Sequence, residues 1–322
     1  MSEVLMRVEG LKTYFYTARG IVKAVDNVSF TLNRGEVLGL AGESGCGKST
    51  TAYSIIRLVP PPGRIVGGRI VFEGQDILKM SSEEYRRKIR WKKISMIFQG
   101  AMNALNPVLS IGDQMAEVFM IHKGMSKKEA LEESAKLLSM VGIDPKRLRS
   151  YPHELSGGMK QRVMIAMALA LNPPLVIADE PTTALDVVVQ AQVMNVLKKL
   201  QKEYKVSIIL ITHDLSLIAE IADKVAIMYA GKIVEFGTAE HIYLNPQHPY
   251  TRGLLASIPR IRGEIKKLEW IPGIPPDLVA PPRGCRFHPR CKYKFEPCDK
   301  EEPPMVEVEP GHYVACWLYA KR

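Results

Sequence analysis

The sequence predicts an α/β fold around a mostly parallel β-sheet, and three observations lead to this prediction. Short apolar segments of strand length, at residues 37–42, 94–98, 175–178 and 207–212, recur along the chain. Segments with helical periodicity separate several of them, and strands that alternate with helices form parallel sheets. The first apolar segment runs into a glycine-rich turn and then into a helix that begins near Lys48.

The composition is that of a folded chain. Its 322 residues suggest roughly two domains, and 46% hydrophobic with 24% charged residues are near globular averages. The mean hydropathy of −0.04, without an apolar stretch of about 18 residues, excludes an integral membrane protein. The net charge of +10 suits nucleic acid, an anionic membrane face or a polyanionic ligand. No secretory signal is recognisable, so we expect a cytosolic chain with reduced cysteines unless they bind metal.

The elements follow in a definite order. Residues 5–15, 22–32 and 68–72 alternate in the manner of antiparallel strands and predict a small β layer beside the parallel core. Helical patterns occupy residues 111–122, 127–141 and 158–171. After Gly237 the character changes, because nine of the 22 prolines lie within residues 271–304 and four of the five cysteines follow residue 280. Long helices and central strands are not expected there. We place a domain boundary near residue 240, giving domains 1–240 and 241–322.

A phosphate-binding loop is predicted at residues 42–50, GESGCGKST, which fill every fixed position of G-x-x-x-x-G-K-[ST]. Glycines let backbone N–H groups converge on an anion, and the following helix adds its positive dipole end. Lys48 adds a point charge, and the Ser49 hydroxyl can ligate Mg²⁺ between the terminal phosphates. The residues expected to bind the nucleotide here are Ser44, Gly45, Cys46, Gly47, Lys48, Ser49 and Thr50.

Two carboxylates, Asp179 and Glu180, end the apolar segment at residues 175–178. Ligands gather at the carboxyl ends of parallel strands. We therefore expect Asp179 to hold Mg²⁺ and Glu180 to polarise an attacking water.

A second glycine motif, LSGGMKQ at residues 155–161, opens another helix. Its amides, with Ser156, Gly157 and Gly158, form a second anion site. One nucleotide does not easily explain two phosphate loops in a monomer, whereas two nucleotides shared between two head-to-tail subunits do.

These motifs together resemble the ATP-binding subunits of ABC transporters, over residues 4–240. The resemblance implies a P-loop NTPase with a RecA-like parallel-sheet core, an antiparallel β subdomain and a helical subdomain at about residues 100–165. Lys48 and Asp179 match the Walker A and Walker B motifs, Glu180 matches the catalytic glutamate, and Ser156 lies in the ABC signature. The implied reaction is ATP hydrolysis to ADP and phosphate.

The resemblance assigns four further residues. Gln99 matches the Q-loop glutamine, which helps to arrange Mg²⁺ and couples to the membrane subunits. Asp186 lies in the D-loop match at residues 184–186, and His213 matches the switch histidine that contacts the γ-phosphate. Phe15 matches the aromatic that stacks on adenine, with Tyr14 and Tyr16 as alternatives.

The C-terminal part narrows the resemblance to one subfamily. Residues 245–252, NPQHPYTR, look like the segment that follows the cassette in dipeptide and oligopeptide importer ATPases. Four cysteines follow, Cys285, Cys291, Cys298 and Cys316, and in that subfamily such thiolates look like ligands of a [4Fe–4S] cluster in a small regulatory domain. From the residues alone, a Cys₄ zinc site, disulfides and free thiols all stay open. The intervals of five, six and seventeen residues match neither two-residue zinc knuckles nor the bacterial ferredoxin run.

The function expected from the resemblance is an importer ATPase for di- or oligopeptides, with oligosaccharides or nickel as alternative solutes. The implied partners are a second ABC ATPase subunit (a sister chain or a second copy), two membrane permeases and an extracytoplasmic solute-binding protein. The expected location is the cytoplasmic side of the cell membrane, as a peripheral protein. A nucleic-acid-associated ABC ATPase is the alternative of a different class. The interval from Lys48 to Ser156 leaves no room for the long insertion such proteins carry, and ribosome-associated members usually hold two cassettes.

Overall fold

The computed structural model describes residues 3–100, 104–183, 185–257 and 270–320. The chain divides into two compact units. The first unit comprises residues 3–79 and the described part of 212–322, and the second comprises residues 80–211. The cysteine-rich segment therefore groups with the phosphate-loop unit instead of forming a compact unit of its own. The division into domains 1–240 and 241–322 stays a prediction.

The first unit begins with an antiparallel sheet, as the sequence predicts. Its strands are β1 (Val4–Thr17), β2 (Gly20–Asn33), β4 (Gly63–Phe72) and β5 (Gln75–Asp76), hydrogen-bonded in the order β2-β1-β4-β5. Alternate side chains of β1, including Met6, Val8 and Leu11, are buried with irregularities at the register shifts. This pattern is the basis of the prediction, because one face of such a sheet packs on a core and the other meets solvent.

A second group of strands in this unit is mixed. The fully buried β3 (Val37–Ala41) pairs in parallel with β9 (Lys224–Tyr229). A two-residue turn with positive φ at Ala230 and Gly231 then reverses the chain into the antiparallel β10 (Lys232–Thr238). Beyond β10 come β12 (His312–Ala315) and β11 (Met305–Glu309). The sequence predicts a mostly parallel sheet and does not predict the antiparallel strands β10, β12 and β11 that extend it.

Short helices complete the first unit. They are α1 (Lys48–Ile55), α7 (Leu215–Ile221), α8 (Ala239–Leu244), α9 (Pro249–Ala256) and the 3₁₀ turn η4 (His288–Arg290). The proline-rich stretch carries no long helix among its described residues, as expected from proline chemistry.

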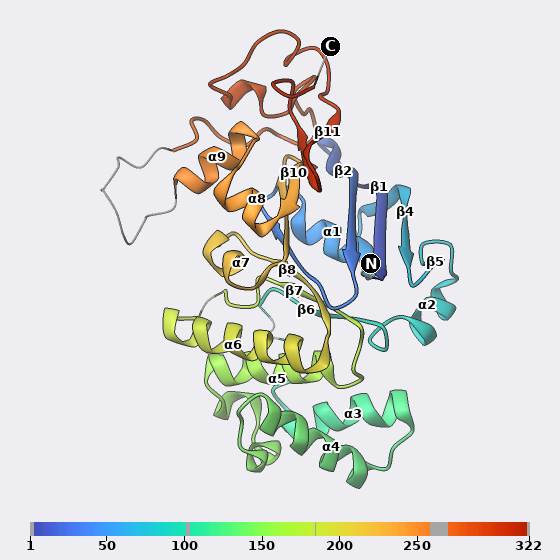
Figure 1. Ribbon diagram of the computed structural model, residues 1–322. Coiled ribbons are helices and arrows are strands. Elements are labelled where there is room, and N and C mark those ends of the chain that lie inside the picture. Colours follow the sequence, from blue (N-terminus) through green and yellow to red (C-terminus); the bar gives the residue numbers. More distant parts are fainter. Residues whose placement is uncertain (1–2, 101–103, 184, 258–269, 321–322) are drawn as a thin grey trace. The chain divides into compact units, whose positions relative to one another are not determined.

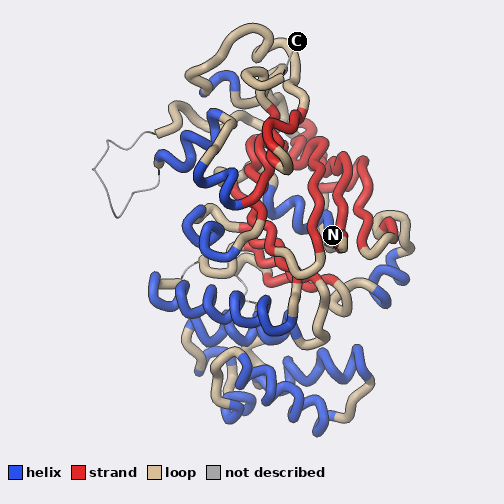
Figure 2. The backbone as a smooth tube through the Cα atoms, in the orientation of Figure 1, coloured by secondary structure: helices blue, strands red, loops and turns tan. Residues whose placement is uncertain are grey.

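The second unit combines parallel strands with helices (Figures 1 and 2). The strands β6 (Ile94–Ile97), β7 (Leu175–Asp179) and β8 (Ser207–Ile211) pair in the order β8-β7-β6. The helices are α2 (Ser82–Lys88), α3 (Ile111–Lys123), α4 (Lys127–Met140), α5 (Gly157–Leu169) and α6 (Val187–Tyr204), with 3₁₀ turns η2 (Pro145–Arg149) and η3 (Pro152–Glu154). The predicted strands and helices of this unit agree with these bounds to within about two residues.

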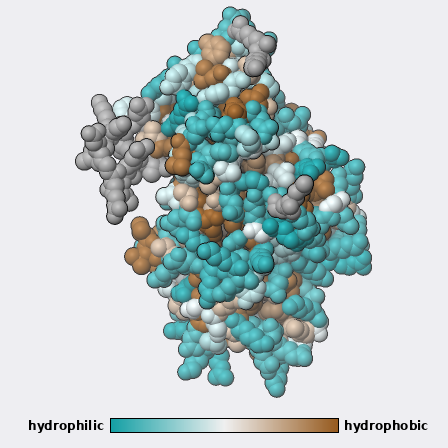
Figure 3. All heavy atoms as spheres, in the orientation of Figure 1, coloured by the Kyte–Doolittle hydropathy of each residue, from teal (hydrophilic) through white to brown (hydrophobic). Residues whose placement is uncertain are grey.

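The helices show no membrane-spanning candidate: within the described ranges, none is both long enough and apolar enough to cross a bilayer. The face drawn in Figure 3 is largely hydrophilic, with separate small hydrophobic areas.

Candidate functional site

The phosphate loop has a backbone that glycine makes possible. Gly42 and Gly47 have φ values of 147° and 106°, and a Cβ on either residue would lie 2.1 Å from a carbonyl oxygen, of Met228 or Ala24. Gly47 is the residue before α1, so the helix N-terminus opens directly from the loop. The first turn of α1 contains no acidic residue, which leaves its positive dipole end for an anion.

The Lys48 ammonium lies inside this loop. Its Nζ donates to the carbonyl oxygens of Gly42 and Glu43, at 2.7 and 3.0 Å, and the residue is buried. The Cys46 side chain is buried beside it, and burial raises the pKa of the Cys46 thiol. A protonated, enclosed thiol supports the interpretation of Cys46 as a loop residue without redox chemistry.

The adenine-stacking candidate lies at the end of β1. Two residues before Phe15, the Thr13 hydroxyl bonds the Ser54 hydroxyl of α1 at 2.7 Å, so this end of the strand lies beside the helix of the phosphate loop. The Tyr14 hydroxyl donates to Asp26 at 2.8 Å, and burial with this bond raises the pKa of Tyr14 to about 12. Tyr16 lies under the Arg64 guanidinium. Phe15 stays the predicted stacking residue.

Asp26 joins β2 to the C-terminal segment. Burial would raise the pKa of this carboxyl, but the Tyr14 hydrogen bond and the charges of Lys232 and Arg286 outweigh burial and lower it. The carboxylate is therefore ionised well below neutral pH.

In the second unit, the structure brings two predicted catalytic residues together. The Gln99 amide Nε2 donates to Glu180 Oε2 at 3.3 Å, and the Thr183 hydroxyl donates to the same oxygen at 2.7 Å. Glu180 directly follows β7 and has a φ of 46°, in the left-handed region. Such a backbone costs about 1 kcal/mol or more in a residue that is not glycine, and it recurs at functional sites. Asp179, the last residue of β7, is fully buried.

The signature and D-loop residues also lie close together in this unit. Ser156 precedes α5 and its hydroxyl accepts from the Met159 amide at 3.3 Å. Asp186 precedes α6 and its carboxylate accepts from the Val189 amide at 3.0 Å. A Cβ on Gly158 would lie 2.4 Å from Val189, so the start of α5 approaches α6 closely because position 158 is glycine. Ala184 of the predicted D-loop lies outside the described residues.

The remaining ATP-site candidate is His213, which lies exposed between β8 and α7. It belongs with Lys48, Ser49 and Phe15 to the first unit, whereas Gln99, Asp179, Glu180, Ser156 and Asp186 belong to the second.

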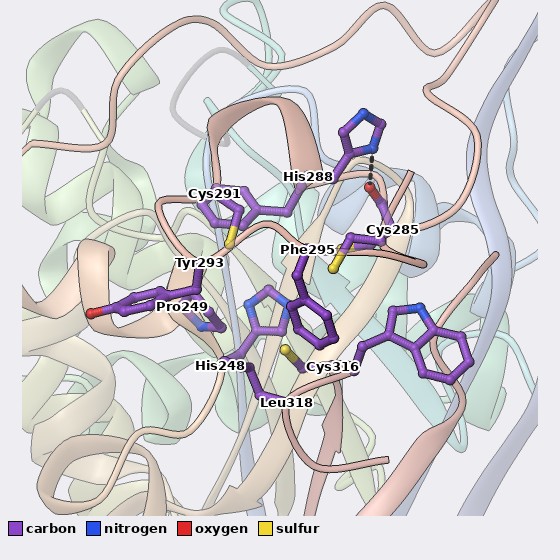
Figure 4. A pocket seen from close by; sticks show the side chains of 12 residues that line it. His248, Pro249, Cys285, His288, Cys291, Tyr293, Phe295, Cys316 and Leu318 are labelled. Atoms are coloured by element: carbon purple, nitrogen blue, oxygen red, sulfur yellow. Dashed lines mark hydrogen bonds between the residues drawn. The ribbon is translucent and has the colours of Figure 1, made fainter. Parts of the chain in front are cut away.

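The four C-terminal cysteines line one small cavity (Figure 4). None of them forms a disulfide. Burial raises the pKa of Cys285 to about 12 and that of Cys316 to about 11, so as free thiols they are protonated at neutral pH. In the described parts of the chain, no three or more His, Cys, Asp or Glu side chains are grouped as a single metal ion requires.

His248 also lines this cavity, and sequence reasoning did not identify it. Its Nδ1 accepts from the Tyr250 amide at 3.0 Å, and burial lowers its pKa to about 3. The neutral ring therefore carries its proton on Nε2, which has no hydrogen-bond partner among the described residues. Figure 4 shows this ring among the cysteine sulfurs. His248 lies in the stretch 245–252, which the sequence pattern singles out. The distance along the chain from Cys285 gave no reason to connect this histidine with the cysteines.

Comparison with known proteins decides the family. The model of the ABC transporter family matches residues 25–183, and that of the oligopeptide/dipeptide transporter C-terminal region matches residues 234–298. The dipeptide transport ATP-binding protein DppD of Bacillus subtilis is 50% identical over 99% of this chain and 96% of its own. The oligopeptide transport ATP-binding protein OppD of Salmonella typhimurium is 49% identical over 98% of this chain and 94% of its own. The chain belongs to the oligopeptide/dipeptide ABC transporter ATP-binding family.

Solved structures agree with this assignment. The dimeric ATP-binding cassette MJ0796, in a post-hydrolysis state with ADP and Pi, has a TM-score of 0.65 and 28% identity, covering 73% of this chain and 98% of that chain. CbiO1 of Clostridium perfringens has a TM-score of 0.65 and 26% identity, covering 76% of this chain and 92% of that chain. The fold is that of an ABC ATPase, an α/β P-loop fold with antiparallel and mixed sheets. This member of the family is an ABC-type ATPase, for which binding of ATP and Mg²⁺ is typical. The full-length matches to transport proteins favour the importer over the nucleic-acid-associated alternative.

Proposed function

We propose that this chain supplies ATP hydrolysis to the import of di- or oligopeptides across the cytoplasmic membrane. It is the ATP-binding subunit of a di/oligopeptide ABC importer. The observation that carries the proposal is the combination, in one chain, of a complete phosphate loop with a C-terminal region typical of peptide transporters. The proposed location is the cytoplasmic membrane surface, where the protein is peripheral and bound to permeases.

The residue roles follow from chemistry that asks mainly for positioning and charge neutralisation. Lys48 and the amides of residues 44–50 bind the β- and γ-phosphates. Glu180 orients the attacking water and takes up its proton, and the bonds from Gln99 and Thr183 hold its carboxylate. Phe15 stacks on adenine and His213 contacts the γ-phosphate.

Mg²⁺ fits the donor set, because hydroxyl, amide and carboxylate oxygens are the ligands it prefers. Ser49, Gln99 and Asp179 would hold it, and the ion would supply charge neutralisation at the terminal phosphates.

A second subunit completes the proposed site. Ser156, Gly157 and Gly158 open α5, whose first turn carries no acidic residue, and this N-terminus suits a phosphate. We assign it, with Asp186, to the nucleotide of the partner ATPase, either a sister chain or a second copy. Two permeases and an extracytoplasmic binding protein complete the transporter.

The four cysteines are proposed to hold a [4Fe–4S] cluster, with zinc as the alternative, in a regulatory C-terminal segment. Two observations support the fit of a cluster. Four soft thiols line one cavity, and cysteine thiolates are the usual ligands of iron–sulfur clusters. The buried Nε2–H of His248 lies at the same cavity and matches an anionic sulfur acceptor. Anaerobically purified protein should be coloured and contain iron and sulfide, whereas a colourless protein with stoichiometric zinc would contradict the cluster.

Reconstitution tests the transport proposal. The chain is combined with two peptide permeases and a peptide-binding protein from the same organism, and uptake of labelled dipeptides and longer peptides into proteoliposomes is measured with and without ATP. We expect ATP-dependent peptide uptake. Uptake of nickel or an oligosaccharide instead would assign the solute differently while keeping the ATPase role.

A further inference from the structure

Arg290 of the C-terminal segment forms an ion pair with a residue of the phosphate loop. We propose that Arg290 is a positioning residue of the ATP site and that it couples the state of the four cysteines to nucleotide affinity. The inference rests on the proposed ATP site at residues 42–50, and all the residues that carry it lie in the first unit.

Arg290 makes a two-pronged contact with Glu43, the second residue of the phosphate loop. Its Nη1 and Nη2 atoms donate to the two carboxylate oxygens of Glu43 at 2.6 and 2.9 Å. The side chain is 6% exposed, its Nε donates to the Pro272 carbonyl at 2.8 Å, and the guanidinium packs over the Tyr229 ring. Such a fork, fixed on the other side by a carbonyl and a ring, holds one geometry.

Glu43 is held from three directions. Besides Arg290, the Tyr250 hydroxyl accepts from the Glu43 amide at 2.9 Å, and the Glu43 carbonyl accepts from Lys48 Nζ. Tyr250 belongs to α9, in the NPQHPYTR stretch, which the ATPase mechanism leaves unused. Two of the three restraints on this residue therefore come from the part of the chain beyond residue 240.

A second arginine of the same segment supports the far side of the loop. Arg286 Nη1 donates to the Ala230 carbonyl at 2.5 Å, and its Nη2 pairs with Asp26. The next amide, of Gly231, donates to the Cys46 carbonyl at 2.9 Å. Arg290 thus acts on the start of the phosphate loop directly, and Arg286 acts on its middle, at Cys46, through a two-residue turn.

The two arginines lie between two of the thiols. Cys285 precedes Arg286, and Cys291 follows Arg290. The interval is compact, because the His288 amide donates to the Cys285 carbonyl at 2.9 Å and the Arg290 amide donates to the Phe287 carbonyl at 3.0 Å. A change in what the thiols bind moves the ends of this short segment, and the arginines transmit the movement to the loop.

Charge gives the contact a further consequence. A carboxylate within a phosphate-binding loop repels the triphosphate, and the Arg290 guanidinium neutralises it. Removal of Arg290 leaves that repulsion in place and also frees the loop.

The experiment measures binding of a fluorescent ATP analogue with Mg²⁺ to the purified full chain. Arg290→Met should weaken binding by at least about fivefold, the lower end of usual site-to-site couplings. Adding Glu43→Gln to that variant should recover part of the loss, because it removes the unpaired charge. Arg34→Met is the control, since it removes the same charge from an arginine that pairs with Glu3 and Glu73 instead of with a loop residue, and it should leave binding unchanged.

Cys291→Ser, alone and with Arg290→Met, tests the coupling, with iron content and urea unfolding measured in parallel. Cys291→Ser alone should weaken nucleotide binding, and it should add little in the Arg290→Met background. Equal affinity of wild type and Arg290→Met would overturn the positioning role, and additive effects of the two substitutions would overturn the coupling. A wild-type chain that binds no nucleotide would refute the proposed ATP site itself, which distinguishes the two failures.

Discussion

Glu235 is expected to be the most costly carboxylate to remove in the first unit. It lies on β10, is 0% exposed, and accepts three hydrogen bonds. The donors are the Gln247 amide at 2.7 Å, the His248 amide at 2.9 Å and His312 Nε2 at 2.8 Å. Glu235 thereby connects β10, the start of α9 and β12.

The perturbation is Glu235→Ala. Each buried donor left without a partner costs about 1–3 kcal/mol, and water entering the vacated space recovers part of this, so we expect a loss of about 4 kcal/mol. This is a large share of a total stability of about 5–15 kcal/mol. Glu235→Gln keeps one acceptor oxygen, but its new NH₂ group faces a hydrogen-bond donor where the second carboxylate oxygen was. It should therefore lower the free energy of unfolding by roughly half as much as Glu235→Ala.

Urea unfolding measures the loss, and hydrogen exchange of residues 247 and 248 locates it. The control is Glu307→Ala, because exposed Glu307 also accepts a backbone amide, from Gly311 at 2.8 Å. It should cost less than about 1 kcal/mol. A loss below about 1 kcal/mol for Glu235→Ala, or unchanged exchange at residues 247 and 248, would refute the reasoning.

Three further predictions concern catalysis, packing and pH. Glu180→Gln should keep nucleotide binding and ATP-driven association with the partner ATPase yet abolish turnover; turnover near the wild-type rate would contradict its role. Gly158→Ala should destabilise the chain by about 1–3 kcal/mol through overpacking against Val189, and Val189→Ala should relieve it in the double variant, as thermal unfolding can check. The pKa of Asp26 is lower in the folded state than in the unfolded state. The ionised carboxylate therefore adds its full share to the free energy of unfolding above the unfolded pKa of about 3.9, and this share is lost as the pH falls through the folded pKa. Asp26→Asn should therefore be less stable than wild type at pH 7, and the difference should shrink only below about pH 4; a constant difference down to pH 2 would be inconsistent with this assignment.

Much of the fold was predictable because its signals are local. The strands at 37–41 and 175–179 are largely apolar runs, and α3 and α4 have regular periodicity with the serine caps Ser110 and Ser126. The helices α2 and α6 were not predicted. The hairpin at residues 305–315 was not predicted, since its strands are only five and four residues long and directly follow a proline-rich stretch where central strands were not expected. Its partner β10 lies about 75 residues earlier in the sequence, and no local pattern encodes that pairing.

The candidate site also combines residues that local motifs predict with contacts that only the structure shows. Loop glycines and the residues at strand ends follow from motifs, because the backbone chemistry requires those residue types. The contact of Gln99 with Glu180 required the structure, since the two residues are 81 positions apart. The sequence assigns no role to the arginines at 286 and 290, and nothing there connects Arg290 with Glu43, which lies 247 positions earlier.

The pairing of β10 with β12 bears on how the protein is made. Glu235 and Phe236 face Val314 and Tyr313, so the strand that covers this edge is synthesised more than 70 residues after β10 itself. Until then β10 presents unpaired amides and carbonyls, the kind of edge that recruits other chains. A fragment that lacks the residues from 305 onward would leave the β10 edge unpaired. We therefore expect such a fragment to aggregate when it is expressed.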